Sequence, residues 1–115
     1  MSKITLWHNP RCSKSRETLA LLQANGHTPE IVTYLTTPPT EADIRNALAL
    51  LGTSASGMMR TKEKRFAELG LTASSNEADL IDAMVANPIL IERPIVFAAG
   101  KAAIGRPPSQ VLDIL

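Results

Sequence analysis

The single cysteine of this 115-residue chain, Cys12, lies in a polar and basic segment whose composition favours a reactive thiolate. Pro10 precedes it closely, and no carboxylate follows until Glu17. The nearby side chains that are basic or can donate hydrogen bonds are His8, Arg11, Lys14 and Arg16. Cations lower the pKa of a neighbouring thiol, and the thiolate is the nucleophilic form of cysteine. The residue types therefore predict nucleophilic chemistry at Cys12, with His8 as a candidate for tuning the thiolate.

A strand followed by a helix is predicted to position Cys12. Ile4 and Leu6 alternate with polar residues, which is the period of a half-buried strand. Beyond Ser13, apolar residues recur at helical spacing up to Asn25-Gly26, a helix stop. Cys12 therefore falls at or just before the first helical turn, where free backbone N–H groups and the helix dipole favour a thiolate. The alternative is an inert, buried cysteine kept for packing, and the polar neighbours disfavour it.

Two arginines that each precede a proline form a second candidate site. Arg93-Pro94 and Arg106-Pro107 flank a predicted hairpin. Proline restricts the residue before it to extended backbone, and the bond to proline is cis more often than other peptide bonds. An arginine held at such a position presents a planar fork of donors that suits an oxyanion. Surface pairing with Glu92 or Asp113 is the alternative, but two such sites beside an activated cysteine favour an anion site.

The hydrophobic pattern predicts the order strand, helix, strand, several helices, two strands and a last helix. Later strands are expected over 29–35, 95–98 and 102–104, with a turn at Gly100-Lys101 between the last two. Helices are expected from a Thr40 cap with Asp43 to Gly52, over 58–69, and after a cap at Ser75. A last helix is expected to begin near Ser109 and to pack through Val111, Leu112, Ile114 and Leu115. A βαβ half and a ββα half around one four-stranded mixed sheet, with a helical insertion between them, is the thioredoxin-like α/β arrangement. A single domain over residues 1–115 is expected.

Composition restricts the classes of partner. Hydrophobic residues make up 44% of the chain and charged residues 20%, the ordinary balance of a globular domain. The net charge is +1 with acids and bases interspersed, which argues against nucleic acid or a membrane surface as a partner. The sequence has no apolar run of about 18 residues, no signal-peptide pattern and no disulfide framework, so a cytoplasmic location is expected. His8, His27 and one cysteine lack the spacing of metal ligands, so no metal is expected.

Three separated motifs resemble those of the glutaredoxin-dependent arsenate reductase (ArsC) family. Residues 8–16, HNPRCSKSR, are similar to the family signature H-N-P-x-C-x-x-S-R. Residues 92–96, ERPIV, and 104–108, IGRPP, resemble the family's E-R-P-I and I-G-R-P motifs. The similarity extends from Ile4 to Leu115, and the chain looks like a short, chromosomal-type member.

The resemblance implies roles for individual residues. Cys12 would be the nucleophile, and His8 would help to depress its pKa. The residues that bind the oxyanion would be Arg60, Arg93, Arg106 and Ser15. The Arg93-Pro94 bond would be cis, as in other thioredoxin-like folds. The implied substrate is arsenate or a related oxyanion, the implied co-substrate is glutathione with no bound cofactor, and the implied partner is glutaredoxin.

The spacing around Cys12 agrees with an external thiol as reductant. The residue three positions on is Ser15, so no internal disulfide can form there. A phosphatase of the Cys-x5-Arg type is disfavoured, because Thr18 stands where its arginine would be. Two alternatives stay open: a glutathione-linked thiol oxidoreductase, and a non-catalytic redox regulator of the same fold that binds RNA polymerase. The presence of all three arginines favours catalysis, since they would offset the repulsion between a dianion and a thiolate.

Overall fold

The computed structural model describes residues 3–72 and 74–115. These residues divide into two compact units. The first comprises the described residues up to Thr37 together with Arg93–Leu115, and the second is Pro38–Glu92. Each unit is described below by itself, and a single domain over the whole chain stays a prediction.

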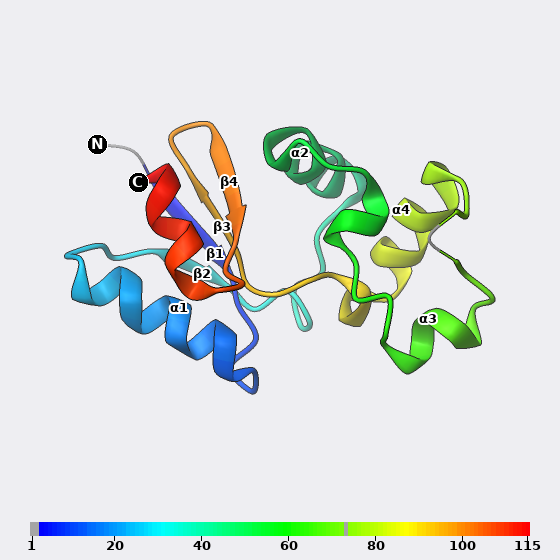
Figure 1. Ribbon diagram of the computed structural model, residues 1–115, viewed down its shortest axis with the longest axis horizontal. Helices are drawn as coiled ribbons and strands as arrows, with labels where there is room; N and C mark the ends of the chain where they lie inside the picture. Colours follow the sequence, from blue (N-terminus) through cyan, green and yellow to red (C-terminus); the bar gives the residue numbers. More distant parts are fainter. Residues whose placement is uncertain (1–2, 73) are drawn as a thin grey trace. The chain divides into compact units, whose positions relative to one another are not determined.

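The first unit is built on a four-stranded sheet in the order β2-β1-β3-β4 (Figure 1). The elements are β1 (Ile4–Trp7), α1 (Ser13–Ala24), β2 (Glu30–Val32), β3 (Ile95–Ala98), β4 (Lys101–Ile104) and a 3-10 helix, η3 (Pro108–Ile114). Strands β1 and β2 are parallel, whereas β1 with β3 and β3 with β4 are antiparallel. The predicted mixed sheet and thioredoxin-like order are therefore confirmed.

One face of this sheet carries an aliphatic core. Leu6 of β1 and Val96 of β3 are partners in the strand register and lie on the same face. They pack with Leu22 of α1 and Val111 of η3, and all four side chains are fully buried. Burying a side chain of this size stabilises the folded state by about 1.5–3 kcal/mol. The cluster therefore holds α1, whose first turn follows Cys12, against the strand that leads to it.

Several predicted boundaries in the first unit differ from the structure. The strand predicted over 29–35 is only Glu30–Val32, because Thr36 turns back to donate hydrogen bonds to the Thr33 carbonyl. The β3–β4 turn is Ala99-Gly100 rather than Gly100-Lys101, since Lys101 already pairs with Ala98.

The last helix of this unit also differs from its prediction. It is a 3-10 helix rather than an α-helix. Val111 is buried and Ile114 packs against the core, but Leu112 and Leu115 are exposed. The predicted packing side was therefore wrong for those two leucines, because a 3-10 helix repeats every three residues and presents one narrow face.

The second unit is helical, with α2 (Glu41–Leu51) and α4 (Glu77–Ala86) packed together. As predicted, α2 begins at a capping box between Thr40 and Asp43 and ends at Gly52 in the left-handed conformation. The cap of α4 is Asn76, not Ser75: Asn76 Oδ1 accepts a hydrogen bond from the Asp79 N–H, whereas Ser75 Oγ accepts one from Thr72.

The helix predicted over 58–69 is interrupted. It is replaced by a 3-10 helix, η1 (Ala55–Met58), and a short α-helix, α3 (Lys64–Glu68). Between them, Met59 pairs with Ile91 in an isolated antiparallel bridge. The Arg60 N–H donates at 2.7 Å to the carbonyl of Leu90, the last residue of a second 3-10 helix, η2 (Pro88–Leu90). These long-range backbone bonds use groups that a continuous helix would need.

In the part of the chain that the structure describes, no helix combines the length and apolar character needed to cross a bilayer.

Candidate active site

Cys12 is the N-cap residue of α1, as the sequence predicts. Its backbone is extended, with φ −94° and ψ 125°, and the helix begins at Ser13. The Cys12 N–H donates to the Asn9 carbonyl at 3.0 Å, which closes the loop between β1 and α1. Cys12 is 9% exposed, so the residue is largely shielded from water.

The surroundings of Cys12 lower its pKa. Burial raises the pKa of the thiol, but the Ser15 N–H, the Arg93 side chain and the Lys14 N–H, which favour the thiolate, outweigh burial. The charge of Arg93 lowers the pKa further. The net pKa of Cys12 therefore lies below its ordinary value. Two of these donors are free N–H groups of the first helical turn, which is the effect expected for a thiolate at a helix N-terminus.

The buried polar residues among positions 3–72 and 74–115 are concentrated around this loop. They are His8, Asn9, Ser15 and Thr18, at 6%, 8%, 0% and 0% exposure. Burying a polar group is costly unless it is hydrogen-bonded. Each of these four residues makes at least one hydrogen bond. In the part of the chain that the structure describes, buried polar side chains therefore gather around Cys12, whereas the rest of the core is apolar.

Ser15 is the centre of that network. Its Oγ accepts a hydrogen bond from the Asn9 N–H at 3.0 Å and lies 2.6 Å from His8 Nδ1. When the His8 proton is on Nε2, the Ser15 hydroxyl donates to Nδ1. Burial, and then the charge of Arg16, hold the pKa of His8 below its ordinary value of 6.5, so the imidazole is neutral at neutral pH. His8 therefore contacts Cys12's helix through Ser15, and the role expected for it in depressing the thiol pKa stays a prediction.

Arg93 and Arg106 are brought together beside Cys12. Arg106 Nη2 lies 3.7 Å from Cys12 Sγ. Arg106 Nε also donates to the Arg93 carbonyl at 2.8 Å, so that the guanidinium is oriented by the neighbouring loop. The Arg93-Pro94 and Arg106-Pro107 peptide bonds are both cis. The arrangement is a nucleophilic sulfur with two guanidinium groups, which suits attack on an oxyanion.

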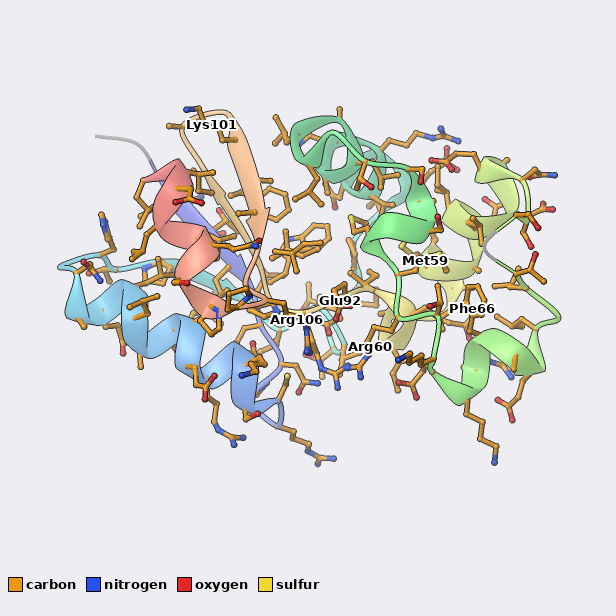
Figure 2. The ribbon with its side chains drawn as sticks, viewed as in Figure 1. Met59, Arg60, Phe66, Glu92, Lys101 and Arg106 are labelled. Atoms are coloured by element: carbon orange, nitrogen blue, oxygen red, sulfur yellow. The ribbon has the colours of Figure 1, made fainter. Side chains whose placement is uncertain are left out.

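Arg60 lies in the second unit, and its place in an oxyanion site stays a prediction. Its Nε is 3.8 Å from Glu63 Oε2, and both side chains are one-quarter exposed. Its Nη1 is buried and has no hydrogen-bond partner among the described residues. Figure 2 labels Arg60 near Glu92, at the ladder in which the Glu92 N–H donates to the Met58 carbonyl at 2.8 Å. The backbone of Arg60 is thus held by a hydrogen bond, and its Nη1 can still donate to a further partner.

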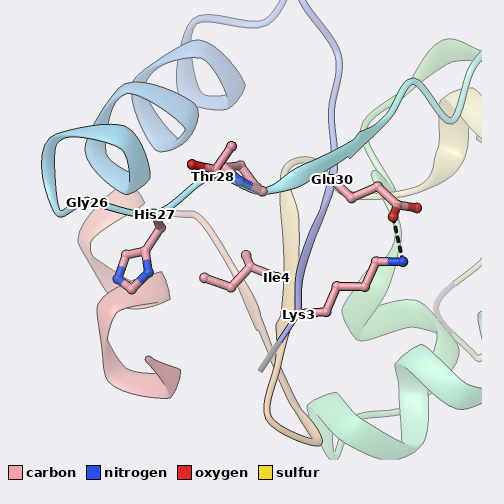
Figure 3. A pocket seen from close by; sticks show the side chains of 7 residues that line it. Lys3, Ile4, Gly26, His27, Thr28 and Glu30 are labelled. Carbon is pink, nitrogen blue, oxygen red and sulfur yellow. Dashed lines mark ion pairs between the residues drawn. The ribbon is translucent and has the colours of Figure 1, made fainter. Parts of the chain in front are cut away.

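A pocket of about 400 Å³ lies elsewhere in the first unit, around the end of α1 and the start of β2 (Figure 3). Lys3 and Glu30 form an ion pair at its edge, and His27 and Ile4 also line it. None of the candidate site residues lines this pocket. The pocket is therefore separate from the Cys12 loop.

A known protein-family model matches this chain. The model of the ArsC family matches residues 7–114, which include the Cys12 loop and both Arg-Pro segments. The chain belongs to the ArsC family.

ArsC relatives cover the chain almost completely. An uncharacterised protein of Escherichia coli (strain K12), YfgD, is 57% identical over 98% of this chain and 97% of its own length. An arsenate reductase of Neisseria meningitidis serogroup A is 46% identical and covers all of both chains. The solved structure of an arsenate reductase from Vibrio cholerae is 45% identical, covers 98% of each chain and has a TM-score of 0.95. The fold and the family are thus shown over the whole length.

Three residues at or beside the candidate site were not predicted from the sequence to have a role there. Asn9 forms the turn before Cys12, since its Oδ1 accepts from the Arg11 N–H at 3.0 Å. An asparagine before proline is a turn signal that could have indicated it. Thr18 and Gly105 are buried at a contact between distant segments. Gly105 belongs to the I-G-R-P motif, whereas no local pattern marks Thr18.

Proposed function

We propose that this protein reduces arsenate to arsenite through a covalent adduct on Cys12, with glutathione and glutaredoxin as the thiols that complete the cycle. The observation that carries the proposal is the Cys12 sulfur, with its lowered pKa, 3.7 Å from the Arg106 guanidinium. Arsenate reductases among the family relatives support the choice of arsenate over other oxyanions.

In the first step, the Cys12 thiolate attacks arsenic(V). A sulfur–arsenic bond forms and an arsenic–oxygen bond breaks, with the oxygen leaving as water after protonation. Arsenate is a dianion at neutral pH, so it is repelled by a thiolate. Arg93 and Arg106 offset this repulsion, because their donors face the place where negative charge accumulates. Arg60 is proposed as a third donor to the same oxyanion, on the strength of its unsatisfied Nη1 among the described residues.

In the second step, a glutathione thiolate attacks the Cys12 sulfur. A sulfur–sulfur bond forms, the sulfur–arsenic bond breaks, and its electron pair stays on arsenic, which leaves as arsenite. Two electrons reduce arsenic(V) to arsenic(III), and the two thiols are oxidised to a mixed disulfide. A glutaredoxin thiolate then attacks the glutathione sulfur and releases the Cys12 thiolate. An external thiol is needed because Cys12 is the only cysteine of the chain.

The remaining site residues act by positioning, and no bound cofactor is needed for these steps. Ser15 is fully buried and its hydroxyl is engaged with His8 and Asn9. It therefore contributes to the site through its N–H, which lowers the pKa of Cys12, while its side chain orders the loop. The cycle consumes reduced thiols, so we place the protein in a reducing compartment, the cytoplasm.

A coupled assay tests the proposal. Wild type is combined with glutathione, glutaredoxin, glutathione reductase and NADPH, with and without arsenate. We expect NADPH consumption that depends on arsenate and is lost in Cys12→Ser. Equal consumption without arsenate, or with a small disulfide in its place, would instead identify a general thiol oxidoreductase.

A further inference from the structure

Gly105 lies where the Arg106 loop meets helix α1 at close range. A Cβ built on Gly105 would be 2.5 Å from Thr18 Oγ1 and 2.8 Å from Pro94 Cγ. Real Cβ atoms essentially never approach other atoms so closely, so one of the neighbours would have to move. Unlike Gly100, with φ +73°, Gly105 lies outside the left-handed region, so glycine is not needed there for its backbone angles. The lack of a side chain at Gly105 therefore matters only because it lets Thr18 and Pro94 lie close to the Gly105 backbone.

The residues that a side chain at position 105 would displace, Thr18 and Pro94, lie beside the candidate site. The Gly105 N–H donates to the Pro94 carbonyl at 2.9 Å. The next residue, Arg106, donates from Nε to the Arg93 carbonyl and reaches Cys12 Sγ with Nη2. Two consecutive residues of one loop are thus bonded to two consecutive residues of the other. A shift at Gly105 would be transmitted to both guanidinium groups.

Thr18 forms the helix side of this contact. It is fully buried, and its Oγ1 donates to the Lys14 carbonyl at 2.8 Å, within the first turns of α1. The Lys14 N–H is one of the groups that lower the pKa of the Cys12 thiol. The same short contact therefore joins the helix that holds the sulfur to the loops that hold the arginines.

We propose that Gly105 is a positioning residue, whose missing side chain lets the Arg106 loop seat against Thr18 and Pro94 so that the guanidinium groups of Arg93 and Arg106 reach the Cys12 sulfur and its oxyanion substrate. The part that concerns the oxyanion rests on the proposed function. The part that concerns the sulfur does not, because it follows from contacts within the chain.

Gly105→Ala is the direct test, with Gly100→Ala as a matched control. Gly100 lies in the hairpin at the Lys101 end of β4, opposite Arg106 (Figure 2), and a Cβ there would meet nothing within 4 Å. Its substitution lowers stability through backbone strain alone. Thermal melting, the pH midpoint of Cys12 alkylation, and arsenate kinetics are measured for both variants and wild type.

We expect Gly105→Ala to raise the alkylation midpoint by about half a unit or more, since the guanidinium groups that favour the thiolate move away. We also expect kcat/KM for arsenate to fall about ten- to a hundredfold, mainly through KM, as one charged contact is lost. Gly100→Ala should melt at a lower temperature but keep the wild-type midpoint and KM. If Gly105→Ala does the same, Gly105 is only a packing residue and the proposal is overturned.

A second variant keeps the test decisive if Gly105→Ala does not fold. Thr18→Ala removes the Thr18 hydroxyl that packs against Gly105. The Arg106 loop then loses a contact with α1, whereas in Gly105→Ala an added methyl group pushes the loop away. We expect the midpoint and the KM to rise in this variant too, and wild-type values for both would refute the positioning role. The alkylation measurements need no arsenate, so they remain valid even if wild type reduces none, the result that would reject the proposed function by itself.

Discussion

Arg106 Nε donates a hydrogen bond of 2.8 Å to the backbone carbonyl of Arg93, which couples the two arginines of the site. Arg106 therefore does two things at once: Nε holds the neighbouring loop and Nη2 faces Cys12 Sγ at 3.7 Å. The planar fork of arginine makes this possible, because its donors have fixed relative directions. A lysine would keep the charge and lose one of the two contacts.

The first prediction follows from this coupling. Arg93→Lys and Arg106→Lys should each lower arsenate turnover about ten- to a hundredfold. Each substitution removes one charged hydrogen bond that stabilises the transition state, and the loss of that free energy lowers the rate by this factor. The double variant should lose less than the sum of the two free energies, by roughly 0.5–3 kcal/mol, as expected for residues in one network. Turnover of wild type, both single variants and the double variant gives the coupling energy. Strict additivity would contradict a shared site.

The second prediction concerns the Cys12 thiol. Its alkylation rate should reach half-maximum at a pH below the ordinary value for cysteine, because the Ser15 N–H, the Arg93 side chain and the Lys14 N–H outweigh burial. Arg93→Gln should raise the midpoint, since it removes both a hydrogen bond and a charge. Arg11→Gln, an exposed arginine of the same loop, is the matched control and should shift it less. A wild-type midpoint at the ordinary value would be incompatible with this site.

The third prediction concerns pH and stability. Burial and Arg16 lower the pKa of His8 in the folded state below 6.5. Between the two pKa values, His8 is protonated in the unfolded chain but not in the folded chain. The free energy of unfolding is therefore unaffected by His8 above pH 6.5 and decreases as the pH falls from 6.5 towards the pKa of the folded state. Urea unfolding between neutral and mildly acidic pH should show this loss. His8→Gln should flatten the dependence, and an unchanged slope would assign the loss to other groups.

The fourth prediction compares two serines of the same helical turn. Ser15→Ala leaves the buried Asn9 N–H and His8 Nδ1 without their partner, at a cost of about 1–3 kcal/mol for each unsatisfied group. Ser13→Ala changes an exposed residue at the start of α1 and should shift the free energy of unfolding by less than about 0.5 kcal/mol. Equal effects of the two substitutions on denaturant unfolding would disprove the role assigned to Ser15.

The fifth prediction concerns the β3–β4 hairpin. Ala99 has φ +51° and Gly100 has φ +73°, so the two-residue turn requires left-handed backbone at both positions. Alanine is strained there, whereas asparagine adopts this conformation readily. Ala99→Asn should therefore stabilise the protein by roughly 0.5–1 kcal/mol, measured as a higher melting temperature. Arsenate kinetics should be unchanged, and a lower melting temperature would argue against this turn geometry.

The sequence by itself determined the local parts of this protein. The strand before Cys12, the helix after it and the Thr40 cap are coded by residues close together in the chain, and the structure confirms them. The three motifs were sufficient to identify the ArsC family. Such features are predictable because periodicity and capping depend on neighbours within a few positions.

Only the tertiary structure decided what depends on distant contacts. The break at Arg60 comes from backbone bonds to Leu90 and Ile91, about thirty residues away, which no local propensity encodes. The requirement for glycine at Gly105 comes from Thr18, on a helix at the other end of the sequence. Secondary-structure propensity depends on neighbours within a few residues, whereas close packing and hydrogen bonding also depend on residues distant in the sequence. Packing and hydrogen bonding between distant segments orient the arginines towards the sulfur.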